Sequence, residues 1–167
     1  PAVVERIRSL VGRGRRVPIL IDSRYRLLDY RGLTACTPNE SEVEQALGVT
    51  IDDNVKMLEK AGKDILARTR MRAVLVTRGS RGMALFVKGQ PPVHIPIFGT
   101  DSIVDVTGAG DTVVSTVTLA LASGGNVEAA ARLANYAGGL VVMKRGTATV
   151  TCDELRGAIQ AAHGADG

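Results

Sequence analysis

Two short aliphatic runs constrain the fold of this chain more than any other feature. VPILID at 17–22 and AVLVTRG at 73–79 lack the alternation of apolar and polar residues that marks a half-exposed strand. Such runs indicate strands buried on both faces, as in a parallel sheet. Helical patterns at 39–48 and at about 52–69 lie between them, and we expect Thr50, with Asp53 three residues on, to cap the second. The sequence therefore predicts an α/β fold with a mostly parallel sheet.

The flanking segments extend this alternation of helix and strand. LTACTPN at 33–39 predicts a second, shorter strand that ends at Pro38, and a helix over 2–11 precedes the first strand. MALFV at 83–87 and PVHIPI at 92–97 predict a hairpin-like edge pair, because proline is disfavoured in central strands. Three further helices are expected at 110–122, 127–143 and 152–162. This order matches half of a doubly wound fold better than a complete one.

Size and charge narrow the functional class. A chain of 167 residues has the size of one domain, and we expect residues 1–167 to form a single domain. The formal net charge is +4, but the basic residues are interleaved with acids along most of the chain. The triplet Arg13, Arg15 and Arg16 has no accompanying aromatic platform on which bases could stack. Nucleic acid is therefore not an expected partner.

The cysteines and the apolar stretches place the protein in a compartment. Cys36 and Cys152 lie far apart and form no CxxC or Cys/His pattern, which argues against a zinc site and a disulfide framework. We therefore expect a reducing cytoplasmic environment. The longest uncharged stretch, 112–127, contains several polar residues and is too short to cross a bilayer, so no membrane partner is expected.

The segment DVTGAGDTVV at 105–114 is the strongest candidate for chemistry. Gly108 and Gly110 carry no Cβ, so the backbone can turn tightly there and approach a ligand closely. If a helix begins at this turn, the amides of its first turn and the positive end of its dipole form a site for anions, above all for phosphate. The alternative is an ordinary glycine turn in which Asp111 caps the helix.

Two further segments have both a functional and a structural interpretation. TRGSRG follows the clearest strand, where open α/β sheets hold nucleotides, so Thr77, Gly79 and Gly82 either contact a nucleotide or form an ordinary turn. In PNESE, Asn39 and Glu42 have the spacing of a capping box. Alternatively they face the phosphates of a nucleotide, and Glu42 holds a water shell around Mg²⁺.

One face of the helix that contains Asn135 carries small residues, among them Gly138 and Gly139. These residues either leave a slot for a flat ring or let helices pack closely. His94 and His163 lie in a proline-rich edge segment and a terminal helix, and we expect both to face solvent.

These segments, in this order and at these separations, resemble the C-terminal half of the PfkB/ribokinase family of carbohydrate kinases. DVTGAGD matches the characteristic turn of that family. LTACTPNESEVEQALG, VLVTRGSRGM and NYAGGLVVMKRGTATVT look most like the heptose-phosphate kinase domain of ADP-heptose synthases. The resemblance runs from about Val17 to Ile159. It implies a ribokinase-like three-layer α/β/α fold without the N-terminal half and the lid of that family.

The resemblance also implies roles for the candidate residues. Asp111 matches the base that takes the proton of the sugar hydroxyl. The anion hole around the transferred phosphoryl group corresponds to Gly108, Ala109 and Gly110. Contacts to the nucleotide correspond to Asn39, Thr77, Gly79, Gly82, Asn135 and Gly138, with Asn135 beside the adenine. Glu42 matches the residue tied to Mg²⁺, and Asp105 the position where several members hold a monovalent cation, such as K⁺.

The implied function is an ATP-dependent kinase that phosphorylates a sugar phosphate, such as D-glycero-D-manno-heptose 7-phosphate, with a homodimer or a missing N-terminal half as partner. Thr116 departs from the family, which has Ala or Gly there, and should narrow the pocket beside Asp111. The alternative from another class is a non-catalytic nucleotide-binding module that has lost the sugar site. A dinucleotide-dependent oxidoreductase is disfavoured, because GAGDTV lacks the third glycine of GxGxxG.

Overall fold

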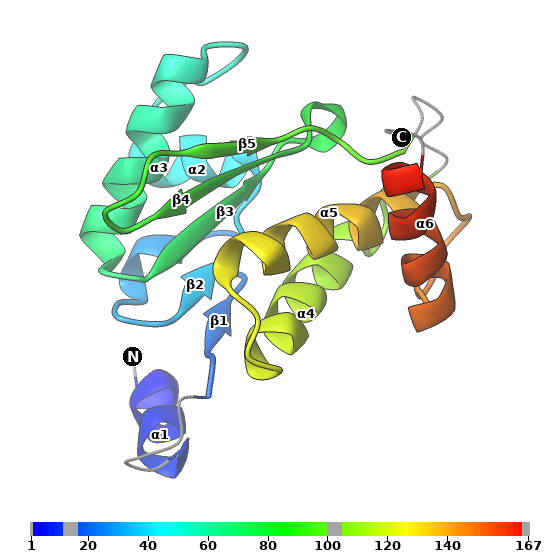
Figure 1. Cartoon of the computed structure of the whole chain (residues 1–167). Helices are drawn as coiled ribbons and strands as arrows, with labels where there is room; N and C mark the ends of the chain where they lie inside the picture. Colours follow the sequence, from blue (N-terminus) through cyan, green and yellow to red (C-terminus); the bar gives the residue numbers. More distant parts are fainter. Residues whose placement is uncertain (1, 12–16, 100–104, 165–167) are drawn as a thin grey trace. The chain divides into compact units, whose positions relative to one another are not determined.

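The computed structural model describes residues 2–11, 17–99 and 105–164 (Figure 1). The triplet Arg13, Arg15 and Arg16 lies outside the described residues. The chain divides into two compact units, 1–77 with 84–93 and 78–83 with 94–167. The single domain expected over residues 1–167 stays a prediction.

The strands form one open sheet in the order β1-β2-β3-β4-β5. They are β1 (Leu20–Ile21), β2 (Ala35–Cys36), β3 (Ala73–Thr77), β4 (Met83–Val87) and β5 (Val93–Ile95). The first three run parallel, with Ala35 of β2 paired to Leu20 on one side and to Ala73 on the other. The predicted α/β fold with a mostly parallel sheet is confirmed.

The two edge strands are shorter than their sequence patterns. The run at 17–22 becomes a strand only over Leu20–Ile21, which pairs with a neighbour on one side alone. In β5, Pro92 and Pro96 flank the strand directly. Proline has no amide to donate to a sheet, so the strand stops where the prolines stand.

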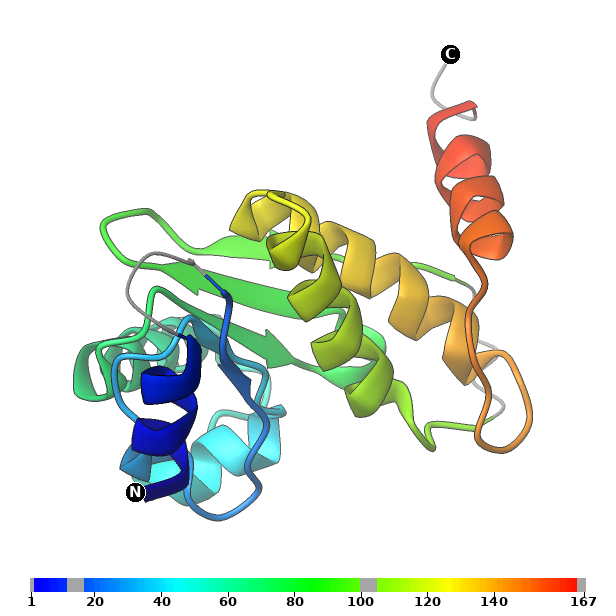
Figure 2. The ribbon, with the colours of Figure 1, turned by 90° about the horizontal axis from the view of Figure 1, so that it is seen from below.

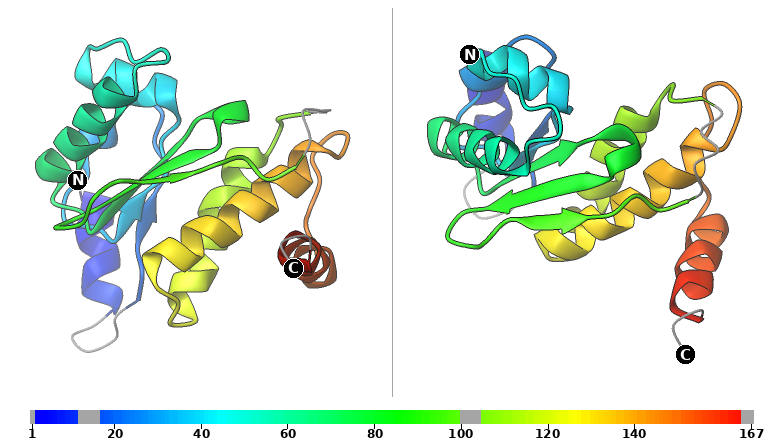
Figure 3. Two further views of the ribbon diagram at one scale, coloured as in Figure 1. Left: turned by 45° about the horizontal axis from the view of Figure 1, so that its top comes forward. Right: turned by 90° about the horizontal axis from the view of Figure 1, so that it is seen from above.

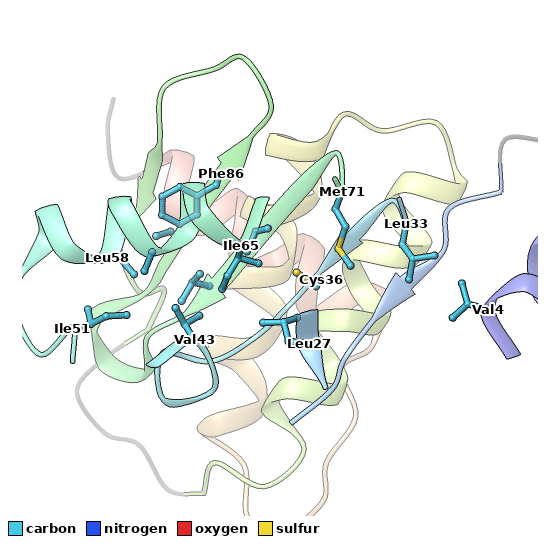
Figure 4. Packing of buried hydrophobic residues seen from close by; sticks show 14 residues of the cluster. Val4, Leu27, Leu33, Cys36, Val43, Ile51, Leu58, Ile65, Met71 and Phe86 are labelled. Carbon is cyan, nitrogen blue, oxygen red and sulfur yellow. The ribbon is translucent and has the colours of Figure 1, made fainter. Parts of the chain in front are cut away.

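The first unit packs its helices α2 (Glu40–Leu47) and α3 (Val55–Thr69) against a continuous apolar core. Figure 4 shows Val43, Leu58 and Ile65 from these helices beside Phe86 of β4. A Cβ on Gly62 would collide with the Phe86 ring, so the ring lies directly against the backbone of α3. The short helix α1 (Ala2–Val11) contributes Val4 to the same cluster.

One predicted helix start is wrong. We expected Thr50, with Asp53, to cap the helix at about 52–69, but Asn54 caps α3, and its side-chain oxygen accepts a hydrogen bond from the Met57 amide (3.1 Å). The amide of Asn54 itself donates to the Ile51 carbonyl (2.9 Å). The chain therefore turns once more before the helix begins.

The second unit contains α4 (Ala109–Ala122), α5 (Val127–Val142) and α6 (Cys152–Gly164). Figures 2 and 3 show α4 and α5 running side by side. A Cβ on Gly138 of α5 would lie 3.2 Å from a methyl group of Val113 of α4, which explains how closely these helices approach.

Both cysteines are free. Cys36 is buried, and burial raises the pKa of its thiol to about 12, whereas Cys152 at the start of α6 is exposed. His94 and His163 are exposed, as expected. Within the described residues, none of the helices has the length and apolar character needed to cross a membrane.

Candidate functional site

The start of α4 is the centre of the candidate site in the second unit. Gly108 is the N-cap residue, with φ +78°, and no side chain caps this end of the helix. A left-handed N-cap of this kind favours glycine, since a Cβ is unfavourable at positive φ. Asp111 is the third residue of α4, so the alternative in which it caps the helix is wrong.

The backbone amides of this turn are partly unused. The Ala109 amide, expected in the anion hole, donates to the Val106 carbonyl at 3.2 Å. Within the described part of the chain, no hydrogen bond engages the amides of Gly110 and Asp111. A Cβ built on Gly110 would find no atom within 4 Å. The turn therefore offers two free donors with open space beside them, which is the arrangement that binds an anion.

Asp111 is accessible. It is exposed and lines a hollow of about 660 Å³ together with residues that carry hydroxyl groups, among them Ser115 and Thr116. Cys152 lines the same hollow. The Thr116 hydroxyl donates to the Thr112 carbonyl of its own helix (2.8 Å), so it is not free to bond a ligand as a donor. A reactant that enters the hollow from solvent can therefore reach the Asp111 carboxylate.

Asp105 connects two loops near the start of α4. Its carboxylate accepts hydrogen bonds from the Thr107 amide (2.9 Å) and from the Gly146 amide (3.1 Å). Hydrogen bonds from Thr107, and then that from Gly146, lower the pKa of Asp105 from its ordinary value. The group is therefore a fixed negative charge, which suits the predicted cation position.

A second acidic residue fixes the loop that leads into α6. Glu154 accepts hydrogen bonds from Lys144 Nζ (2.7 Å) and from the Thr151 amide (2.8 Å). The hydrogen bond from Lys144, followed by those from Thr151, lowers the pKa of Glu154 to about 2. Lys144 also donates to the Thr149 carbonyl (2.7 Å). This network holds the segment after α5 against the start of α6.

In the first unit, Asn39 and Glu42 form the capping box of α2. The Asn39 side-chain oxygen accepts from the Glu42 amide (2.8 Å), and Glu42 Oε2 accepts from the Asn39 amide (2.9 Å). The structural interpretation is thus correct, and it leaves room for the functional one. Asn39 keeps its Nδ2 donor and Glu42 keeps Oε1, which are the groups that a phosphate oxygen and a magnesium-bound water require.

Thr77 lies beside Asn39. The two residues form an isolated parallel bridge at the carboxyl ends of β2 and β3, and the Thr77 amide donates to the Pro38 carbonyl (3.0 Å). Asn39, Glu42 and Thr77 are therefore brought together at the edge of a parallel sheet where α/β proteins hold ligands.

The predicted glycines divide into open and packed positions. A Cβ on Gly79 would meet nothing within 4 Å, so a ligand could approach the backbone there. On Gly82 it would collide with the Ile95 carbonyl oxygen, and on Gly138 it would press against Val113. Close packing thus accounts for glycine at 138, as in the helix-packing alternative, and close packing with φ +76° accounts for glycine at 82.

Asn135 lies next to a separate hollow of the second unit. This hollow, of about 460 Å³, is lined by Asn135 and by apolar and aromatic residues that include Pro96, Phe98 and Tyr136. Asn135 is 6% exposed, and its Nδ2 donates to the Pro96 carbonyl (2.8 Å). The rings of Phe98 and Tyr136 are 4.4 Å apart between centroids. The amide oxygen of Asn135 is the group left to meet a ligand.

Thr37, at the carboxyl end of β2, has a feature that sequence analysis passed over. Its hydroxyl is buried without a hydrogen-bond partner. A polar residue directly after a short buried strand was the available signal. Among the described residues, no three side chains of the His, Cys, Asp and Glu types gather as a metal cage, so any divalent ion would depend on water and ligand oxygens.

Comparison with known proteins shows to which family the chain is similar. Residues 2–154 match the pfkB family of carbohydrate kinases. The chain is 42% identical over 155 residues to the bifunctional protein HldE of Pseudomonas aeruginosa, which covers 92% of this chain and 32% of that protein. HldE of Caulobacter vibrioides is 43% identical over 152 residues, 90% of this chain and 31% of that protein. The chain thus spans about a third of the length of these curated relatives.

Among solved structures, Arabidopsis thaliana ribokinase complexed with ribose and ATP is similar, with a TM-score of 0.74 and 27% identity, over 86% of this chain and 47% of that one. Ribokinase from Giardia lamblia shares the fold, with a TM-score of 0.78 and 20% identity, over 96% of this chain and 55% of that one. Sequence match and fold agree, and the chain belongs to the pfkB family of carbohydrate kinases.

Proposed function

We propose that this chain is the nucleotide-binding part of an ATP-dependent kinase that phosphorylates a sugar phosphate of the D-glycero-D-manno-heptose 7-phosphate type. Membership of the pfkB family supports the kinase, and similarity to the HldE proteins, with the motifs that look like heptose-phosphate kinases, supports the sugar. Because the chain spans about a third of those relatives, the activity of the whole protein is part of the proposal.

The observation that carries the proposal is the open start of α4 with Asp111 beside it. Phosphoryl transfer passes through a loose transition state, so an enzyme mainly positions the reactants and neutralises charge on the equatorial oxygens. The free amides of Gly110 and Asp111 can meet those oxygens without rearranging. The exposed carboxylate of Asp111 can accept the proton of the sugar hydroxyl, and a weak base suffices if the proton moves late.

The other candidate residues supply nucleotide and ion contacts in this proposal. Asn39 Nδ2 donates to a phosphate oxygen, and Glu42 Oε1 holds a water of the Mg²⁺ shell. When bound, Mg²⁺ would neutralise charge on the nucleotide phosphates. Thr77 and Gly79 face the nucleotide, Asn135 offers its amide oxygen to the base, and Asp105 is the position proposed for K⁺. A partner, either a second copy or an N-terminal half, would complete the sugar site.

The test compares two exposed aspartates in the first turns of helices. Asp111→Asn should lower sugar-phosphate-dependent ADP release by about 10³-fold or more, while MgATP affinity stays within a few-fold. Asp153→Asn in α6 is the matched control, because Asp153 is exposed and pairs with Arg156 (2.7 Å), and it should leave both quantities unchanged. Loss of MgATP affinity in Asp111→Asn with normal turnover would contradict the base assignment.

A non-catalytic nucleotide-binding module is the second candidate. It needs only the free amides at the start of α4 and no sugar site. MgATP binding by the unaltered chain without ADP release in the presence of the sugar phosphate would support this candidate. Turnover by the chain would exclude it.

A further inference from the structure

The hydroxyl of Thr37 is the one buried side-chain polar atom of the described residues that lacks a hydrogen-bond partner. The residue is 6% exposed. A buried hydroxyl without a partner costs free energy that valine, of nearly the same shape, would not. Thr69 shows the usual solution, because it is fully buried and its hydroxyl donates to the Ile65 carbonyl (2.7 Å). Thr37 therefore needs an explanation that Thr69 does not.

The position of Thr37 places it at the ligand edge of the sheet. It follows β2 directly and lies between two points of the β2–β3 pairing, Cys36 with Val74 and Asn39 with Thr77. Two residues beyond it, Asn39 is exposed. Open α/β sheets bind ligands at the carboxyl ends of parallel strands, and Thr37 stands there beside Asn39 and Thr77.

The face on which Thr37 lies separates it from the helix-covered core. Successive side chains of a strand point to opposite faces. Cys36 belongs to the core cluster that α2 and α3 pack against, whereas Ala35, which shares the face of Thr37, is buried outside that cluster. The hydroxyl is thus not a buried polar group of the α2 and α3 core. Its neighbour Pro38 has no amide to offer it.

We propose that Thr37 is a binding residue whose hydroxyl donates to a phosphate oxygen of a bound reactant. This inference rests on the proposed function, since the phosphate is that of the nucleotide or of the sugar phosphate. Threonine is kept in place of valine because the ligand supplies the missing partner. A hydroxyl can donate to a phosphate oxygen and adds no charge of its own.

The test uses Thr37→Val and Thr37→Ser in the full chain, with Thr69→Val as the matched control. Without ligand, Thr37→Val should keep the thermal midpoint of the unaltered chain or raise it by about 2–4 °C, because an unsatisfied group is removed. Thr69→Val should lower the midpoint, because it removes a hydrogen bond that is made. A clear loss of midpoint in Thr37→Val would show that the hydroxyl has a structural partner and would overturn the proposal.

Calorimetric titration with MgADP and with D-glycero-D-manno-heptose 7-phosphate identifies the phosphate. Thr37→Val should weaken one of these ligands about tenfold, as expected for losing a hydrogen bond to a charged group, while Thr37→Ser and Thr69→Val stay within about twofold. The weakened ligand names the source of the phosphate. Unchanged affinity for both ligands would overturn the role of Thr37 and leave the proposed function intact. An unaltered chain that binds neither ligand would overturn both.

Discussion

The starts of α2 and α4 solve the same physical problem in opposite ways. Each helix begins with unpaired amides and the positive end of a dipole. At α2, Asn39 and Glu42 answer each other through two hydrogen bonds, of 2.8 and 2.9 Å. At α4, a glycine with φ +78° precedes the helix and no side chain responds. Side chains of the protein thus cap the start of α2, whereas no side chain caps the start of α4.

Apart from α4, the α-helices that follow α2 in the described chain all have side chains that cap their starts. Asn54 caps α3 and Asn126 caps α5, and Thr151 with Glu154 closes the start of α6. A missing side-chain cap costs stability, and the uncapped start of α4 is where the proposed phosphate would supply the acceptors. Experiments that close the open end, or open a closed one, test this contrast.

Among the experiments on helix starts, the largest effect is expected from filling the open start of α4. Gly110→Ala adds a methyl group where the fold has free space, so the folded chain should tolerate it, but the methyl would lie beside the free amides. Phosphorylation should fall about 10²-fold, in line with losing a donor to a charged transition state. Gly157→Ala in α6, also open around its Cβ, is the control and should leave turnover unchanged. Normal turnover in Gly110→Ala would show that no anion approaches this corner.

Opening closed ends should have a smaller effect and should separate two uses of asparagine. Asn39→Ala and Asn54→Ala each remove an N-cap, so each should lower the free energy of unfolding by about 1 kcal/mol. MgADP affinity should fall about tenfold in Asn39→Ala alone, because only that side chain is proposed to meet a phosphate. Calorimetry would measure the MgADP affinity, and urea unfolding would measure the stability. Equal MgADP affinities in the two variants would mean that Asn39 acts only as an N-cap.

The smallest effect concerns the capped start of α6 and is measured as the pH dependence of stability. The folded pKa of Glu154 is about 2, below its ordinary value of 4.5, because Lys144 and Thr151 donate to the carboxylate. A depressed pKa means that the folded state favours the ionised form, so its contribution is complete above about pH 4.5 and is lost as the pH falls towards 2. Thermal midpoints across this window should drop less for Glu154→Gln than for the unaltered chain. Parallel curves would mean that the network adds nothing.

Local signals decided how well each element could be predicted. α2 was predictable at both ends, since Asn39 and Glu42 start it and Gly48, with φ +66°, ends it. The start of α3 was not, because Thr50 with Asp53 and Asn54 with Met57 compete within five residues, and only the extra turn at Ile51 selects the second.

The site was predictable where chemistry leaves a pattern of residue types, and not where it depends on space. The GAGD segment predicted a helix start with an acidic residue in the first turn, and α4 has both features. Gly110 and Gly138 look alike in sequence, yet one faces open space and the other faces Val113. That difference comes from neighbours distant in sequence, which a local pattern does not contain. Thr37 was missed for the same reason, since an absent partner is visible only in three dimensions.

The unequal burial of the two cysteines allows one of them, Cys152, to be labelled selectively. With a pKa of about 12, Cys36 stays protonated and enclosed at neutral pH, so alkylating reagents should reach only Cys152. Cys152 lines the hollow that Asp111 lines. A maleimide dye on this thiol would therefore report occupancy of that hollow by fluorescence, with no engineered residue.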